Sequence, residues 1–212
     1  IAVLPAGVVC VGMGQTVVFS VLPPLARELG LLDIQMAAVF GLSALFWVLM
    51  VPYWGRRSDA VGRKPLILTG LCGFVASTVL FAFSIGLGLA GALGGFALYA
   101  LIVATRSIYG VVGAATPPAA QAYIADRTPP ERRAAGLSGF SAAFGIGAML
   151  GPGVGGAVAA LGPLAPLYAV AALAAAATLT IWLFLPERSS PIPRAPRPRL
   201  RVSDQRLRPF LI

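Results

Sequence analysis

The chain alternates between apolar stretches of about twenty residues or more and short segments that hold nearly all of its charges. An α-helix crosses the roughly 30 Å hydrocarbon core of a bilayer in about 20 residues. Six stretches reach this length, and we predict that they are membrane-spanning helices: residues 2–24, 34–54, 66–86, 95–124, 134–160 and 165–185. The pattern therefore predicts an all-α, polytopic membrane protein in which residues 1–186 form one six-helix bundle.

Proline residues interrupt the two longest stretches. The fourth contains Pro117 and Pro118, and the fifth contains Pro152. Proline lacks a backbone N–H, so we expect tilted or kinked helices whose freed carbonyls are satisfied by neighbouring helices.

After the sixth stretch, the composition changes. Residues 187–208 are rich in Pro and Arg and have no periodic apolar pattern, which predicts a flexible cytoplasmic linker, either solvated or lying on anionic lipid headgroups. Residues 209–212 are apolar again, and we interpret them as the start of a seventh helix. Because the chain starts at Ile1 and stops within this segment, we expect a fragment of a longer protein.

Charge is scarce and unevenly placed. Charged residues make up 11% of the chain, against about 25% in soluble domains. Of its 16 basic residues, fourteen lie between spans two and three, between spans four and five, or after span six, while the other side of the membrane has Arg27 alone. By the positive-inside rule, we expect the N-terminus and the 187–208 linker to be cytoplasmic, at the inner (plasma) membrane. The net charge of +9 is thus a topology feature, and we expect no nucleic-acid partner.

Metal and enzymatic chemistry are not expected. The chain has no His, and its two cysteines, Cys10 and Cys72, lie in apolar runs, where we predict buried free thiols. No span combines His, Asp or Cys as a membrane enzyme would require. We therefore predict no metal site, no cofactor and no enzymatic activity.

The segment between spans two and three carries the first candidate site. Gly55, Asp59, Gly62, Arg63 and Lys64 follow the spacing G-x3-D-x2-G-R-K. Asp59 and Arg63 are four apart, so one helical turn would bring them together as an ion pair, while glycine permits a tight turn. The neighbouring Arg56 and Arg57 suit an ordinary basic hairpin that only sets topology.

Arg106 is the second candidate, since it is the only charge inside a predicted span. At mid-helix it costs about 2.5–3.5 kcal/mol on insertion scales, so it should face a partner or a hydrated cavity. Four residues are predicted to share its helix face as a cavity wall or a close helix contact: Gly110, Gly113, Pro117 and Gln121. In the first span Gly12, Gln15 and Phe19 are candidates to face the same cavity.

Small residues recur every fourth position in the fifth span, at Gly139, Ala143, Gly147, Gly151, Gly155 and Ala159. Such a face lets another helix approach closely. On physical grounds alone a packing role is favoured, with Pro152 bending the helix.

These motifs resemble those of the major facilitator superfamily. The segment from Gly55 to Lys64 is similar to its loop signature, departing at Arg57 and Ala60, and the resemblance implies that Asp59 and Arg63 form a conformational latch. "RSIYGVVGAA" is similar to its fourth-helix motif, which implies a role for Arg106 in proton coupling. Five residues resemble the fifth-helix motif of its drug:proton antiporters, with Ser138 in place of an earlier glycine: Gly147, Gly151, Pro152, Gly155 and Gly156. "YIADRTPPERRAAGLSG" is similar to tetracycline-efflux-like members and implies a charged pair between Asp126 and Arg132 or Arg133.

The resemblance implies a fold and a function. This chain would be the six-helix N-terminal half, built from 3+3 inverted repeats, of a twelve-helix transporter whose partner is the missing C-terminal half. It would export a small drug-like or amphipathic compound by alternating access, driven by the proton gradient. Alternatives are an importer of a small metabolite, and a non-transporting scaffold or channel subunit.

No Asp or Glu lies in any predicted span. A titrating carboxylate is therefore expected in the missing half, unless Arg106 tunes a relay of water molecules. The substrate is expected to be neutral, weakly charged or anionic.

Overall fold

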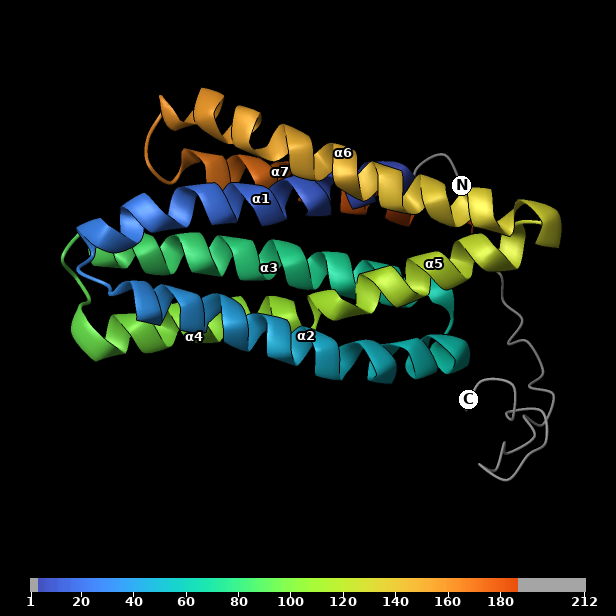
Figure 1. The fold of residues 1–212 in the computed structure, drawn as a ribbon, viewed down its shortest axis with the longest axis horizontal. Coiled ribbons are helices and arrows are strands. Elements are labelled where there is room, and N and C mark those ends of the chain that lie inside the picture. Colours follow the sequence, from blue (N-terminus) through green and yellow to red (C-terminus); the bar gives the residue numbers. More distant parts are fainter. Residues whose placement is uncertain (1–3, 187–212) are drawn as a thin grey trace, which may run out of the picture.

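A computed structural model describes residues 4–186, which form helices joined by short turns, with no strand in this part of the chain (Figure 1). Its elements are α1 (Leu4–Glu28), α2 (Asp33–Val61), α3 (Arg63–Leu89), α4 (Gly95–Val111), η1 (Gly113–Ala115), α5 (Thr116–Arg127), η2 (Pro130–Arg132), α6 (Arg133–Ala159) and α7 (Ala165–Phe184). Counting α4 to α5 as one unit, six are long and apolar enough to cross a membrane. The prediction of six apolar helices that could span a membrane is confirmed, with bounds that differ from the predicted ranges. The predicted linker and seventh helix lie outside the described residues.

Two helices extend well beyond their predicted ends. α1 continues to Glu28 and α2 continues to Val61, through most of the segment predicted as a loop. Only Gly62, with φ 111°, interrupts the chain before α3 begins at Arg63. The difference arises because apolar runs mark the hydrocarbon core alone, whereas a helix of 29 residues, about 44 Å long, continues into the headgroup region.

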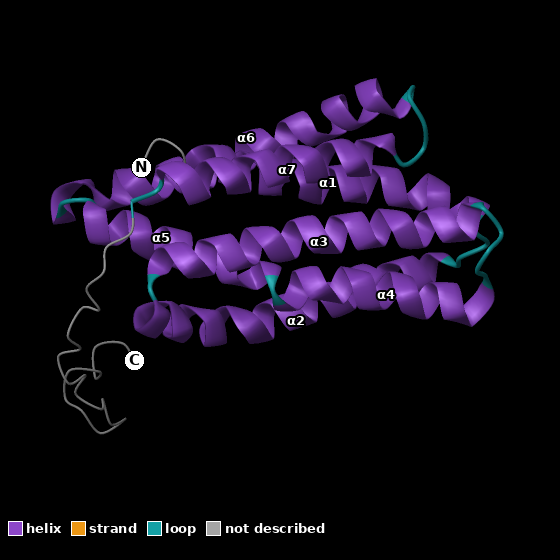
Figure 2. Cartoon of the chain, turned by 180° about the vertical axis from the view of Figure 1, so that it is seen from behind, coloured by secondary structure: helices purple, strands orange, loops and turns teal. Residues whose placement is uncertain are grey.

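The helices run side by side in two groups (Figures 1 and 2). α1 packs against α6 and α7, while α2 packs against α4, and α3 lies between the groups with contacts to α4 and α7. Helices of the first three spans thus pack mainly against helices of the last three, as expected for a 3+3 inverted repeat.

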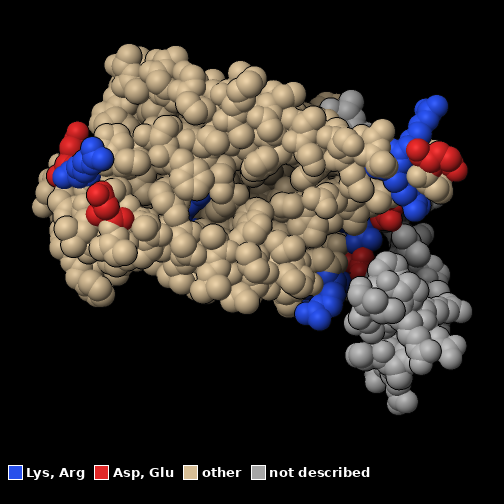
Figure 3. All heavy atoms as spheres, viewed as in Figure 1, with Lys and Arg blue, Asp and Glu red and all other residues tan. Residues whose placement is uncertain are grey.

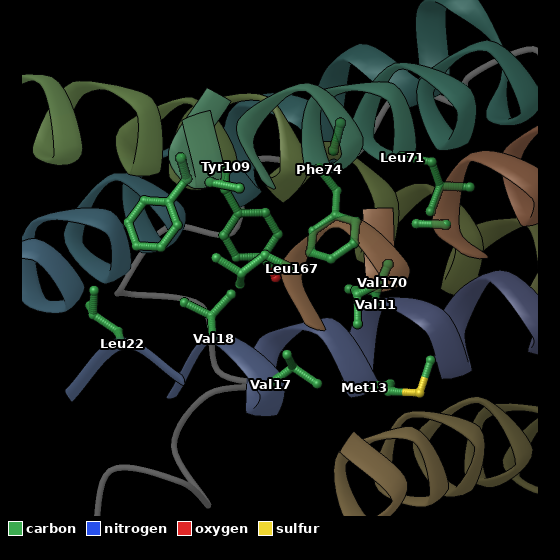
Figure 4. Close-up of a cluster of buried hydrophobic side chains, with 14 of the residues drawn as sticks. Val11, Met13, Val17, Val18, Leu22, Leu71, Phe74, Tyr109, Leu167 and Val170 are labelled. Atoms are coloured by element: carbon green, nitrogen blue, oxygen red, sulfur yellow. The ribbon is translucent and has the colours of Figure 1, made fainter. Parts of the chain in front are cut away.

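The core lies around α1 and α3. About half of the membrane window of each is buried, at 50% and 56%, against 11% for α2 and 22% for α6. Figure 4 shows α1 side chains meeting the Phe74 and Tyr109 rings, with Leu167 and Val170 close by. The apolar faces of α2 and α6 remain exposed, as suits helices that meet lipid or further protein within a membrane.

The cysteines differ from expectation. Cys10 is half-buried and Cys72 is exposed on α3, so the prediction of two buried thiols was wrong for Cys72. Membrane helices are apolar on every side, and for this reason an apolar neighbourhood in the sequence does not show which residues face the bundle interior.

Candidate functional site

Arg106 lies in the bundle interior on α4, with 2% of its surface exposed. Its Nη2 donates to Oε1 of Gln15 on α1 at 3.4 Å. The guanidinium also lies over the Tyr109 ring, 4.7 Å from the ring centroid. Its Nε has no hydrogen-bond partner within the described residues. The side chain therefore does not extend to the membrane surface, and its hydrogen-bond partner is Gln15, which was predicted to face the same cavity.

Aromatic rings and one hydroxyl surround this position. Tyr109 lies 4.9 Å from Trp47 of α2 and 5.5 Å from Phe74 of α3, measured between ring centroids; Figure 4 shows the Tyr109 and Phe74 rings side by side. Ser43 of α2 donates from Oγ to the Arg106 carbonyl at 3.2 Å. The neighbours of the Arg106 guanidinium are therefore neutral, and its cation–π contact with Tyr109 supplies part of the stabilisation that water would otherwise give.

No carboxylate compensates the charge of Arg106 within residues 4–186. The ion pairs there join Arg63 to Asp59 and to Asp126, at the end of the bundle. Figure 3 shows charged side chains at the two ends of the molecule and a small blue area at the floor of a hollow between them. A buried cation without a counter-ion is costly, so this position is suited to accept an anionic group or to order water.

Arg63 organises a second cluster where α2 turns into α3. Its Nη1 donates to Asp59 Oδ1 and to Ser58 Oγ, both at 2.6 Å, and its Nε donates to Asp126 Oδ2 at 3.1 Å. We call Ser58, Asp59, Arg63 and Asp126 the Arg63 cluster. The predicted Asp59–Arg63 ion pair is present, and it is connected to the end of α5. Lys64 is half-buried beside it, while Arg56 and Arg57 are exposed.

The predicted pairing of Asp126 with Arg132 or Arg133 was wrong. Asp126 binds Arg63 instead. The η2 turn carries Arg132 and Arg133 into exposed positions, and Arg133 donates to the Thr128 carbonyl at 3.3 Å. Sequence proximity favoured the nearer arginines, whereas the packing of α5 against α3 brings the more distant one within reach.

The small-residue face of α6 packs directly on α1. A Cβ added at Gly147 would overlap the Val9 carbonyl, and one added at Gly151 would overlap Thr16. Gly155 is also buried, whereas Gly139, Pro152 and Gly156 are exposed, and α6 runs unbroken through Pro152. The predicted close helix contact is present, and its partner is the first span.

Of the predicted cavity residues, one packs against a helix and another is exposed. Gly12 faces α6, where an added Cβ would overlap the Phe144 carbonyl, so it lines no cavity. Gln121 is exposed, unlike Arg106, Gly110 and Gly113, because the fourth span is not one straight helix, and its place on a cavity wall stays a prediction. The 3₁₀ segment turns its following residues relative to those before it.

Phe19 is 47% exposed and pairs with Phe40 of α2, with ring centroids 4.4 Å apart. Its predicted contact with a ligand stays a prediction.

Sequence reasoning missed several contacts of these sites. Tyr109 lies three residues after Arg106, a helical spacing that could have revealed it. Ser58 is only five residues from Arg63, and its contact was also missed. Ser43 and Trp54 had no such indication, because each bonds to a segment distant in the sequence.

Known proteins similar to this chain form a consistent group. The family profile described as Major Facilitator Superfamily matches residues 6–211. The tetracycline resistance protein, class B, of Escherichia coli is 33% identical over 176 residues, covering 81% of this chain and 40% of that protein. Multidrug resistance protein 2 of Bacillus subtilis (strain 168) is 30% identical, covering 84% and 42%. The chain thus spans about two fifths of the length of these relatives.

Among solved structures, the crystal structure of the human organic anion transporter MFSD10 (TETRAN) superposes with a TM-score of 0.71 at 25% identity. The superposition covers 92% of this chain and 49% of that one. The similarity therefore extends across the whole six-helix bundle, while about half of the larger structure has no counterpart here.

Proposed function

Because the chain belongs to the Major Facilitator Superfamily, we propose that it is the first half of a proton-coupled exporter of small drug-like or amphipathic compounds that works by alternating access. The tetracycline and multidrug resistance relatives support the direction of transport. We place the N-terminus and the Arg63 cluster on the cytoplasmic side of the inner membrane, following the basic residues. A second six-helix half would complete the substrate cavity, since one half provides only one wall.

The observation that carries the proposal is the buried charge of Arg106, which has no carboxylate partner among residues 4–186. It lies mid-span on a wall of neutral side chains, with Gln15 as its polar neighbour. We assign it to the substrate and proton pathway, where its counter-charge is an acidic group of the transported compound or a carboxylate from beyond this chain. The solved neighbour named as an organic anion transporter supports the first of these sources.

The Arg63 cluster is proposed as the conformational latch. Its three ionic groups connect α2, α3 and α5 at one end of the bundle. Such a network is stable while these helices stay together and must rearrange when they separate. We assign it to holding the cytoplasmic end closed, and expect Asp59→Asn to weaken that closure.

Inverted membrane vesicles containing the full-length protein test this function. Accumulation of labelled candidate compounds is followed with and without a proton gradient, for the unaltered protein, Arg106→Gln, Arg106→Lys and the exposed-charge control Arg57→Gln. We expect gradient-dependent accumulation that Arg106→Gln abolishes, Arg106→Lys reduces and Arg57→Gln leaves unchanged.

Other outcomes reject parts of the proposal. Transport that persists after the gradient is collapsed excludes proton coupling. Accumulation in intact cells in place of inverted vesicles indicates an importer. Unchanged transport in Arg106→Gln removes Arg106 from the pathway.

A further inference from the structure

The fourth span breaks at a defined point. α4 ends at Val111, a 3₁₀ turn follows over Gly113–Ala115, and α5 begins at Thr116 with Pro117 and Pro118. Neither proline has an N–H to continue the α-helical ladder. The N–H of Ala115, which in a continuous α-helix would bind the Val111 carbonyl, binds the carbonyl of Val112 at 3.1 Å. The break therefore changes which donor is available to the Val111 carbonyl.

Trp54 of α2 supplies a donor to that carbonyl. Its indole Nε1–H donates to Val111 O at 2.6 Å, between residues 57 positions apart. The next residue, Gly55, lies against the double proline, since a Cβ added there would be 3.8 Å from Pro118 Cβ. One turn of α2 thus covers the break and donates a hydrogen bond to the Val111 carbonyl.

On its other side the break rests on α3. A Cβ added at Gly70 would overlap Thr116, and one added at Gly73 would overlap the Val112 side chain. Thr116 Oγ1 also donates to the Ile67 carbonyl at 3.4 Å. The α3 side thus combines close packing at two glycines with a long hydrogen bond of 3.4 Å, whereas the α2 side makes the shorter hydrogen bond of 2.6 Å through Trp54.

Trp54 also stands between the two sites described above. Four residues further along α2 begins the Arg63 cluster, which holds the far end of α5 through Asp126. Five residues before Val111 on α4 lies Arg106. The fourth span is therefore attached to the end of α2 and the start of α3 at two places: at the last residue of α4 through Trp54, and in the last turn of α5 through Arg63.

From this arrangement we infer that Trp54 is a positioning residue: its indole N–H ties the α2 segment of the Arg63 cluster to the break in the fourth span, and so transmits movement at the α2–α3 turn to Arg106. The consequence for transport rests on the proposed function. The hydrogen bond and its control of α5 do not, and they are tested without a substrate.

The first experiment measures local opening of α5 in the full-length protein in native membranes. With Cys10 and Cys72 replaced, one new cysteine is placed at the buried Ala120 of α5 or, as a reference, at the buried Ala174 of α7. Maleimide labelling rates are compared between Trp54→Phe, which removes the indole N–H while keeping a ring, and Trp182→Phe, an exposed tryptophan on α7.

Losing one such hydrogen bond should raise labelling at position 120 about three- to tenfold in Trp54→Phe. We expect no change at position 174, and none at either position in Trp182→Phe. An equal rise at positions 120 and 174 would mean general loosening of the bundle and would overturn the inference, as would no rise at all.

A protein without the two prolines tests whether the effect of Trp54 depends on the break in the fourth span. In Pro117→Ala/Pro118→Ala the fourth span can become a continuous α-helix, in which the Ala115 N–H binds Val111. Trp54→Phe should then cause no further rise in labelling at position 120. A full additional rise in this background would contradict the assignment.

Transport is measured on the same variants. Trp54→Phe should lower the maximal rate several-fold and leave the half-saturating concentration unchanged, because it alters a conformational step and no substrate contact. If the unaltered protein transports nothing while the labelling results hold, the proposed function fails and the role of Trp54 in positioning α5 stands. A raised half-saturating concentration with an unchanged maximal rate would overturn the inference.

Discussion

Two helix crossings hold the bundle together, and they occupy equivalent places in the inverted repeats. In one, α1 crosses α6; in the other, α4 crosses α2. Each has a glycine on the inner helix whose added Cβ would overlap a carbonyl of the outer helix: Gly12 meets Phe144, and Gly110 meets Ser43. The same device thus brings both pairs of backbones together.

The two crossings differ in what surrounds the glycine. At the α1–α6 crossing the outer helix adds its own Gly147 and Gly151, which also meet backbone atoms of α1. At the α2–α4 crossing the contact continues through Ser43 and Trp47 to the buried Arg106 and Tyr109. One crossing is a tight backbone contact, and the other is a polar and aromatic contact around a charge. We expect the first to carry stability and the second to carry function.

The largest expected effect comes from placing a larger side chain in the small-residue contact between α1 and α6. Gly147→Val should force α6 away from α1, because its added atoms fall on the Val9 carbonyl and near the Met13 nitrogen, both backbone. Overpacking of a core costs about 1–3 kcal/mol, and backbone cannot yield as a side chain does, so we expect at least about 3 kcal/mol. Thermal unfolding of the purified full-length protein in detergent measures the loss.

Matched controls lie on the same helix. Gly139 and Gly145 have nothing within 4 Å of an added Cβ and lie on different sides of α6. Gly139→Val and Gly145→Val should leave the unfolding temperature within a few degrees of the unaltered protein. Equal destabilisation by all three would show that the effect belongs to valine in the helix and not to the crossing.

Gly110→Ala tests the second crossing and should have the next largest effect. Its Cβ would overlap the Ser43 carbonyl and lie 3.0 Å from Phe46 Cβ, so α2 must move outward. We expect a loss of about 2 kcal/mol in stability together with loss of most transport, since Ser43 and Trp47 move with α2. Vesicle transport and thermal unfolding are measured on the same preparation.

Gly41→Ala is the control for this crossing, because the space around Gly41 on α2 is open. Transport that survives in Gly110→Ala, at equal protein amounts, would remove the functional distinction between the two crossings.

Local features of the helices could be predicted from the sequence, and the partners of these features in the fold could not. The four-residue spacing of Gly147 and Gly151 identified a close-packing face, and the spacing of Asp59 and Arg63 identified an ion pair, because helical geometry alone decides which neighbours share a face. Which helix meets a face depends on tertiary packing. For that reason Gly12 was assigned to a cavity, and Asp126 to arginines nearby in the sequence.

The break in the fourth span shows the same limit. Pro117 and Pro118 predicted a disturbance and a need for donors from neighbouring helices. Nothing in the sequence pointed to the Trp54 indole as one of them, since the two segments are separated by the whole of α3.

Gln15→Glu should change stability less than the two glycine substitutions do, and it should stabilise the protein where they destabilise it. A carboxylate near Arg106 would supply the counter-charge that the described residues lack, and the charged hydrogen bond should stabilise the protein by about 1 kcal/mol. Transport should fall, because the guanidinium would no longer be free to attract an anionic group. Thermal unfolding and vesicle accumulation give the two readouts.

Gln35→Glu is a control outside the crossing, since Gln35 accepts from the Leu32 N–H at the start of α2. A loss of stability in Gln15→Glu would indicate that Arg106 already has a counter-ion in the full-length protein.

Ser43→Ala is the mildest change and separates the hydrogen bond from the crossing itself. It removes the bond from Ser43 Oγ to the Arg106 carbonyl and leaves the backbone contact with Gly110 in place. At 3.2 Å this bond should contribute about 0.5–1 kcal/mol. Ser138→Ala on α6, whose hydroxyl donates only within its own helix, is the matched control and should be nearly neutral. If Ser43→Ala destabilises as much as Gly110→Ala, the α2–α4 crossing depends on its polar contact more than on its close backbone approach. The two crossings would then differ in construction as well as in role.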